Sequence, residues 1–222
     1  MFCFEGTEAI SHMSVRNRPE VFNEPCMFAA ISVKGLENET KVLESQVPLW
    51  KHFGQPGSGN GSSGATYGLP RFENSEFNVR FPFAGIELQD DDIPLEVYMK
   101  GWSPFIPTDA DNSSLPVGSL EYSLKNTGNS KIEVLFSYHT KNFMRQSGGR
   151  ASVKSVAGGF ILSEAGTSEN PEKQGDSPGA SLYVPFTLKP GKTRTIRLMM
   201  AWYVPNTNMK YGQVSNIRLP HT

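Results

Sequence analysis

Asp109 and Asp111 are the residues of this chain whose type and spacing most readily suggest catalysis. A pair of carboxylates can hydrolyse a glycosidic bond when the two groups are held about 5–5.5 Å or about 6.5–9.5 Å apart. Their spacing in the sequence does not set that distance, and aspartates also accept backbone N–H bonds in irregular loops. The sequence therefore favours a loop-bracing role for this pair, with a complete small hydrolase as an alternative.

These carboxylates lie in a proline-rich stretch, GWSPFIPTDADNSSLPV, that covers residues 101–117. Its three prolines each fix φ and remove a backbone donor, so neither a helix nor a central strand is expected here. A loop of this length inside a compact domain is usually functional or disordered. Trp102, Phe105 and Ile106 argue against disorder, because solvated linkers rarely carry such side chains. We therefore predict an ordered loop with a polar tip around Asn112 and the two aspartates.

Tryptophans offer a second kind of chemistry, because their rings can stack on sugars. Trp50, Trp102 and Trp202 are the three in this chain. Trp202 alternates in phase with the apolar residues before it, which predicts a core position. Trp102 is out of phase with the apolar positions of residues 95–99, so it is the better candidate for a surface or interface contact.

Two further motifs are formal matches to known binding sites. Residues 59–64 match GxGxxG, but they sit in a longer Gly/Ser stretch without the strand and helix that a dinucleotide site needs, so a surface loop is favoured. Asp90, Asp91 and Asp92 could supply oxygen ligands to calcium. Three consecutive aspartates point in different directions, however, so an acidic turn is favoured, and no metal site is predicted.

Composition excludes several classes of protein. The formal net charge of −1 gives no electrostatic reason to expect nucleic acid as a partner. No apolar run approaches the roughly 20 residues that a membrane-spanning helix needs. Cys3 and Cys26 cannot form a disulfide framework; one bridge between them and two buried thiols are both open, the thiols being favoured. The start of the chain reads as strand rather than as a leader, so we expect a fragment of something longer.

Alternation of apolar and polar residues predicts the fold. The predicted strands are residues 27–33, 41–47, 95–99, 120–124, 132–138, 182–188 and 196–202. The Asn/Gly-rich break at residues 126–129 predicts a hairpin, and Pro190-Gly191 suits the centre of a type II turn between the last two strands. With 21 glycines, 16 prolines and no clear amphipathic helix, the chain is expected to be all-β, a large antiparallel β-sandwich.

The proline-rich loop also carries a family resemblance. Residues 95–122, LEVYMKGWSPFIPTDADNSSLPVGSLEY, resemble the N-terminal domain of glycoside hydrolase family 116, the family of bile-acid-type β-glucosidases and non-lysosomal glucosylceramidases. The positions that match are Ser103, Pro104, Phe105, Ile106, Pro107, Asp109, Asp111, Asn112, Ser113, Ser114, Pro116 and Val117. Phe81-Pro82-Phe83 and the segment from Ala201 to Asn206 also look like that domain. The resemblance spans roughly residues 25 to 208.

What the resemblance implies is architectural. Enzymes of this family are retaining exo-β-glycosidases in which a β-sandwich, supersandwich-like, precedes an (α/α)6 helical barrel that holds both catalytic carboxylates. We therefore expect an N-terminal sandwich domain at residues 1–208, its start apparently truncated, and an exit linker or tail at 209–222 toward a missing helical domain. The chain alone would then have no catalytic residue and no cofactor, whereas its parent protein would hydrolyse a β-glucoside or a glycolipid.

Two readings of the function follow. In the first, the chain is a non-catalytic domain that packs on and supports the (α/α)6 catalytic domain. In the second, it is a free-standing carbohydrate-binding module. The candidates for domain-interface or sugar contact are Trp102, Phe105, Asp109, Asp111, Asn112 and Ser113.

Overall fold

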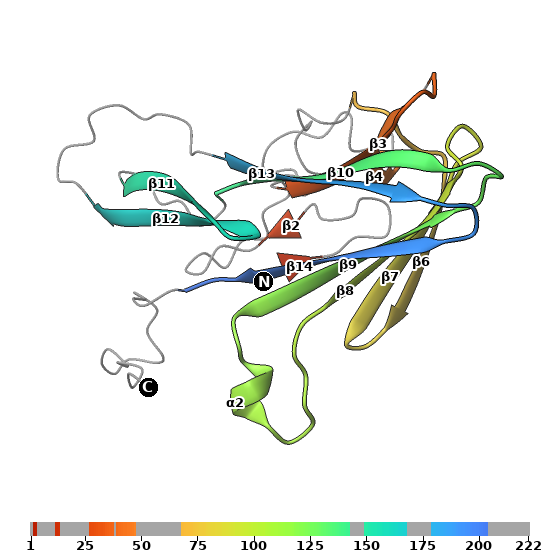
Figure 1. The fold of residues 1–222 in the computed structure, drawn as a ribbon. Helices are drawn as coiled ribbons and strands as arrows, with labels where there is room; N and C mark the ends of the chain where they lie inside the picture. The colour runs from red at the N-terminus through yellow and green to blue at the C-terminus, as the bar shows by residue number, and fades with distance from the viewer. Residues whose placement is uncertain are drawn as a thin grey trace, which may run out of the picture.

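The protein is a sandwich of two five-stranded sheets (Figure 1). A computed structural model describes residues 2–3, 12–13, 27–37, 39–47, 68–142, 149–167 and 179–203. Among these residues the single helix is the one-turn α2 (Ala110–Ser113). The predictions of an all-β chain with little helix and of a sandwich are confirmed. No helix of the described part is long and apolar enough to cross a membrane.

One layer, here called the β10 sheet, has the strand order β13-β10-β3-β4-β5. Its strands are β13 (Gly179–Leu188), β10 (Ile132–Lys141), β3 (Met27–Val33), β4 (Thr40–Ser45) and β5 (Arg71–Phe72). Neighbours are antiparallel, as predicted, except for the short β5, which pairs parallel to β4.

The other layer, the β9 sheet, is antiparallel throughout and has the order β14-β9-β8-β7-β6. Its strands are β14 (Thr193–Ala201), β9 (Val117–Asn126), β8 (Leu95–Trp102), β7 (Phe83–Gln89) and β6 (Asn74–Arg80). Two separate hairpins complete the described elements: β1 (Phe2–Cys3) with β2 (His12–Met13), and β11 (Gly149–Val156) with β12 (Gly159–Thr167).

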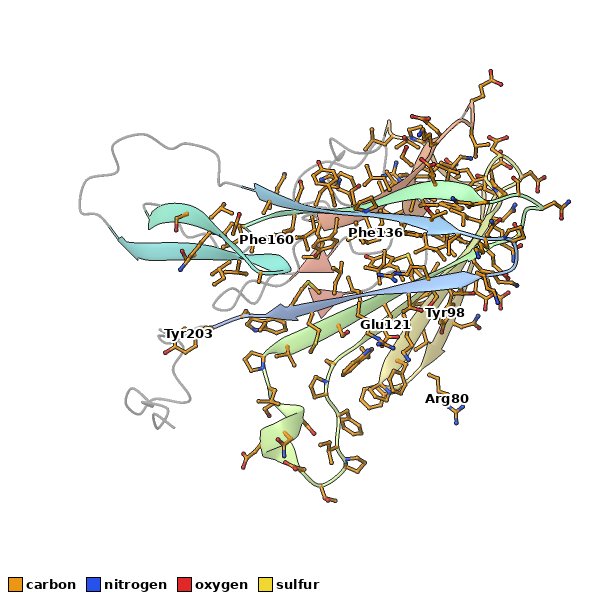
Figure 2. All side chains as sticks on the ribbon, viewed as in Figure 1. Arg80, Tyr98, Glu121, Phe136, Phe160 and Tyr203 are labelled. Carbon is orange, nitrogen blue, oxygen red and sulfur yellow. The ribbon has the colours of Figure 1, made fainter. Side chains whose placement is uncertain are left out.

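The core lies between the two sheets and is built by the alternation seen in the sequence. Every second residue of β8, β9 and β10 is buried, and Phe136 of β10 lies between the layers (Figure 2). Its ring packs on that of Tyr122 of the facing sheet, with 5.1 Å between centroids. Full burial of such a side chain stabilises the fold by about 1.5–3 kcal/mol. The alternation therefore predicted the buried faces of these strands correctly.

The predicted hairpin at residues 126–129 is wrong, because β9 and β10 belong to different sheets. The chain crosses from one layer to the other there, and it does so again between β13 and β14 (Figure 1). The second crossing does contain the predicted turn: the N–H of Lys192 donates to the carbonyl of Lys189 at 3.1 Å, and Gly191 has φ of 67°. A turn with glycine at that left-handed position is type II. The sequence thus predicted the type II turn correctly, but it did not predict which sheet the chain joins after the turn.

Asn126 joins the two crossings and is fully buried. Its side-chain Nδ2 donates to the carbonyls of Ser130 at 2.8 Å and Leu188 at 3.2 Å. Its backbone N–H donates to the carbonyl of Lys192 at 3.0 Å, and its carbonyl accepts from Gly191 at 2.9 Å. Asn126 therefore satisfies backbone groups of both connections. We call the end of the sandwich where these two connections lie the clasp end.

A buried ion pair bridges the sheets at this same end. Lys41 of β4 contacts the carboxylate of Asp90, which follows β7, and their side chains are 4% and 0% exposed. Asp90 also accepts the N–H groups of Glu73 at 3.1 Å and Asp92 at 2.9 Å. The three consecutive aspartates thus form a turn braced by Asp90, and the prediction of an acidic turn is confirmed. Among the described residues no group of three or more His, Cys, Asp or Glu could hold a metal ion.

Some predictions fall on residues outside the described part. These are the interpretation of residues 59–64 as a loop, the pairing or burial of Cys26, the role of Trp50 and the linker at 209–222. Trp202, predicted as core, is half-buried just beyond β14. A Cβ atom at Gly118 would lie 4.0 Å from its ring, so it packs at the edge of the core rather than inside it.

Candidate functional site

The proline-rich loop joins two directly paired strands and projects away from both sheets (Figure 1). The strands β8 and β9 remain in register up to Trp102 opposite Ser119. From there the chain leaves the sheet and carries α2 at its far end. The prediction of an ordered loop between strands is confirmed. The expectation that no helix forms here is wrong, because the one-turn α2 fits between Pro107 and Pro116, where no proline interrupts the chain.

Asp109 holds the short helix by capping its N-terminus. Its Oδ1 accepts the backbone N–H of Asn112 at 3.0 Å, and its Oδ2 accepts the side-chain Nδ2 of the same residue at 2.6 Å. A carboxylate at this position satisfies a donor that the first turn of a helix leaves open. Both oxygens of Asp109 are therefore engaged inside the loop.

Ser113 closes the base of the loop tip. Its Oγ accepts the N–H of Ile106 at 2.9 Å and donates to the carbonyl of the same residue at 3.1 Å. The N–H of Asp109 also donates to this carbonyl, at 3.1 Å. Between these contacts Thr108 has φ of 70°, a left-handed conformation that a β-branched residue rarely adopts. Internal hydrogen bonds thus hold the tip in a shape that the chain alone would avoid.

The ionisation of Asp109 does not suit the general acid of a glycosidase. Hydrogen bonds from the side chain and the backbone of Asn112 lower the pKa of Asp109 below its ordinary value. A general acid needs the opposite shift, toward a raised pKa that keeps the proton on at neutral pH. Asp111 is exposed in the first turn of α2. Because both carboxylate oxygens of Asp109 already accept hydrogen bonds from Asn112, its contacts favour bracing of the loop.

Apolar side chains are exposed on and beside the loop. The ring of Phe105 packs edge-on against that of Phe81, with centroids 4.7 Å apart and an interplanar angle of 74°. Phe81 belongs to the turn between β6 and β7 and is 74% exposed, while Phe105 is 47% exposed. Ile106 and Leu115 of the loop are exposed as well. We call Phe81, Phe105, Ile106 and Leu115 the loop-end patch.

Trp102 lies on the outer face of the β9 sheet, at the end of β8 where the loop begins. Its neighbours across the strands are Phe83 and Ser119. Trp102 is half-buried, and Lys100 places its Nζ 5.0 Å from the centroid of the Phe83 ring. Trp102 thus faces away from the core, as its phase in the sequence predicted. Glu121 lies in the next row of the same face, opposite Lys100 (Figure 2).

The chain leaves the β9 sheet beside the loop. Strand β14 ends at Ala201, opposite Val117. The N–H of Trp202 then donates to the carbonyl of Pro116 at 3.0 Å. The exit of the sandwich, the loop and the β6–β7 turn therefore share one end, which we call the loop end.

The structure brings together most of the predicted site residues but adds two that the patterns did not single out. Asp109, Asn112 and Ser113 act within the loop, while Phe105 faces Phe81. Phe81 and Phe83 are indicated by the family resemblance alone. Two aromatic residues around a proline, in a turn between strands, were the available signal.

Comparison with known proteins identifies the family. A family model described as "beta-glucosidase 2, glycosyl-hydrolase family 116 N-term" matches residues 11–159 and residues 140–218. No curated protein matches the chain. The two matched segments together cover most of the chain, and the resemblance stated for the proline-rich loop is confirmed. The chain belongs to the N-terminal domain family of glycosyl hydrolase family 116.

Proposed function

We propose that this chain is the non-catalytic N-terminal sandwich of a retaining β-glucosidase or glucosylceramidase of family 116. The catalytic carboxylates belong to an (α/α)6 domain of the parent protein, which acts on a β-glucoside or a glycolipid. The sandwich packs on that domain through its loop end. Membership of the family supports a catalytic partner domain.

The observation that carries the packing role is the exposure of the loop-end patch on an internally braced loop. Soluble domains rarely leave several large apolar side chains exposed together without a partner. Phe105 and Ile106 are about half exposed, at 47% and 49%, although Ser113 and Asp109 fix the backbone that carries them. A preorganised apolar loop loses little conformational entropy on binding. Rigid support of this kind suits a neighbour whose catalytic groups need precise placement.

Two experiments test this proposal. The isolated chain should not hydrolyse nitrophenyl β-glucosides, and turnover that copurifies with the chain would contradict it. A separately produced helical domain of the parent should bind the chain in gel filtration. Phe81→Ser with Phe105→Ser should abolish this binding while the circular dichroism stays unchanged. Tyr183→Ser, which removes an exposed aromatic ring from the other sheet, is the matched control.

A carbohydrate-binding module is the second candidate, and Trp102 favours it. The adjacent rings of Phe83 and Trp102 lie on an outer sheet face, beside a polar row that contains Lys100 and Glu121. Aromatic rings with a polar surround can stack on sugars. Calorimetric titration with gluco-oligosaccharides separates the two candidates: saturable binding that Trp102→Ala abolishes supports the module, and absence of binding supports the docking domain.

A further inference from the structure

Strand β6 forms one edge of the β9 sheet and is exposed along its whole length. Within the described part of the chain it pairs on one side alone, with β7. The row of backbone N–H and C=O groups on the other side of such a strand is a template for a further strand. Seven residues, Asn74–Arg80, are long enough for a stable pairing.

The two faces of β6 differ in character. Phe77 lies opposite Ile86 of β7 and Val79 lies opposite Ala84, which places both on the core side of the sheet. They are nevertheless 41% and 66% exposed. Glu76, Asn78 and Arg80 alternate with them on the outer face.

The charges on the outer face favour one partner, a second copy of the same strand. When two copies of β6 pair antiparallel about a twofold axis normal to the sheet, residues of equal parity face one another. An axis at Glu76 or at Arg80 would place like charges opposite each other, which is unfavourable. An axis at Asn78 pairs Glu76 with Arg80 of the second copy, twice by symmetry.

The same register is favourable on the apolar face. With the axis at Asn78, Phe77 lies opposite Val79 of the second copy, again twice, so the exposed apolar side chains cover each other. Aromatic residues opposite β-branched residues are good cross-strand pairs. An axis at Phe77 or at Val79 would leave Glu76 opposite Asn78 or Pro82 instead. Charge and apolar pattern therefore select the same arrangement.

The two charged side chains of this register, Glu76 and Arg80, are exposed on the outer face of β6. Among the described residues Arg80 has no ion-pair partner, and it extends away from the sheet (Figure 2). Glu76 accepts one hydrogen bond from Nδ2 of Asn78, at 3.0 Å, and that bond is exposed.

We propose that the chain associates with a second copy of itself through β6, in antiparallel register about Asn78, to give one β-sheet that continues across both molecules. This inference does not depend on the proposed function, because it uses the edge of the sheet and not the loop-end patch. A helical domain that covers β6 instead is the competing occupant, and the experiment distinguishes the two.

Sedimentation equilibrium of the chain at several concentrations tests the proposal. Wild-type protein should show a reversible monomer–dimer equilibrium. Glu76→Arg and Arg80→Glu should each raise the dissociation constant about tenfold, because two attractive cross-strand pairs become repulsive. The double variant Glu76→Arg/Arg80→Glu should restore the wild-type value, since the swapped charges again face one another. Lys154→Glu, in the separate β11–β12 hairpin, is the control for net charge and should leave the dissociation constant unchanged.

A covalent test fixes the register. Asn78→Cys should form a disulfide-linked dimer under mild oxidation, whereas Ser152→Cys, an exposed serine of β11, should not. A monomer at all concentrations with no cross-linking at position 78 would overturn the proposal. A dimer that ignores both charge reversals would overturn it too, because another surface would then be responsible. Loss of self-association only when the helical domain is added would support β6 as a surface that the two partners share.

Discussion

The ring of Phe105 rests edge-on against the ring of Phe81, 4.7 Å between centroids, and connects the proline-rich loop to the turn between β6 and β7. Both rings are largely exposed, at 47% and 74%. The contact therefore adds little to the core of the sandwich, but it orients two separate segments as one surface. The contact should therefore be measurable as a coupling energy between substitutions of the two rings.

A double-mutant cycle with Phe81→Ala and Phe105→Ala should give a coupling energy of about 0.5 kcal/mol, the lower end of the range for aromatic pairs. Exposure of both rings limits the value. Urea denaturation of the wild type, the two single variants and the double variant measures it. The pair Phe81→Ala and Tyr183→Ala, whose rings lie on different sheets, should be additive. A coupling of zero for Phe81 and Phe105 would show that the two segments are independent in solution.

Removal of Asp90 should strongly destabilise the sandwich, because the buried ammonium group of Lys41 loses its closer partner and keeps the half-exposed carboxylate of Asp92 at 3.4 Å. Asp90→Ala should cost about 3–5 kcal/mol in the free energy of unfolding. Lys41→Met combined with Asp90→Leu should cost less than Asp90→Ala, since no buried charge is then stranded. Glu133→Gln, in the exposed pair with Lys34, serves as the control with little effect. Equal costs for the single and double variants would contradict a stranded charge.

The same ion pair predicts how the free energy of unfolding falls at acidic pH. Burial opposes ionisation of Asp90, but hydrogen bonds from Lys41 and from the backbone of Asp92 and Glu73 outweigh it and lower the pKa of this carboxyl. Because the folded pKa lies below the unfolded one, the stabilisation is complete above about pH 4 and is lost as the pH falls through the folded value. Urea midpoints from pH 7 to pH 2 should show this loss, and Asp90→Asn should flatten it. An unchanged slope in Asp90→Asn would assign the acid limb to other carboxyls.

Asn126→Ala should destabilise the fold by about 2–4 kcal/mol, because it leaves the buried carbonyl of Leu188 and the part-buried carbonyl of Ser130 without a side-chain donor. Thermal unfolding with a matched urea titration measures the change. Asn74→Ala, at the exposed start of β6, should have little effect and controls for the substitution itself. A small cost at Asn126 would mean that water replaces its amide.

Asp109→Ala should open the loop tip without unfolding the sandwich. The capping bond to Asn112 is lost, so limited proteolysis within residues 103–116 should accelerate several-fold. Asp109→Asn keeps an acceptor for the backbone N–H and should be cleaved more slowly than Asp109→Ala. Asp111→Ala, in the exposed first turn, is the matched control. Equal cleavage of all three variants would show that the cap does not hold the tip.

The strands and their buried faces could be predicted from the sequence, but which strands pair with one another in a sheet could not. Alternation around Tyr122 and Phe136 correctly placed both rings in the core. The same alternation is compatible with two strands side by side in one sheet and with two strands facing each other across the core. The turn at residues 126–129 reverses the chain in either case. Only contacts distant in sequence, such as those of Asn126 with Leu188, select the second arrangement.

The candidate site was predictable in part for a related reason. Local chemistry indicated an ordered loop with Asp109 as a brace, since capping depends on neighbours a few residues away. The contact of Phe105 with Phe81 depends on the pairing of four strands, which no local pattern encodes. The burial of Lys41 could not be predicted from local patterns either, because its partner Asp90 follows a strand of the other sheet. The roles of Trp102 and the loop-end patch toward a partner stay predictions.

The clasp end and the loop end of the sandwich have different roles. The polar links that hold the layers together, at Asn126 and at the Lys41–Asp90 pair, lie at the clasp end. The loop that projects from Trp102 hangs from the opposite end and uses its own hydrogen bonds. Loops of other lengths and sequences can therefore be grafted between β8 and β9 while the scaffold stays intact.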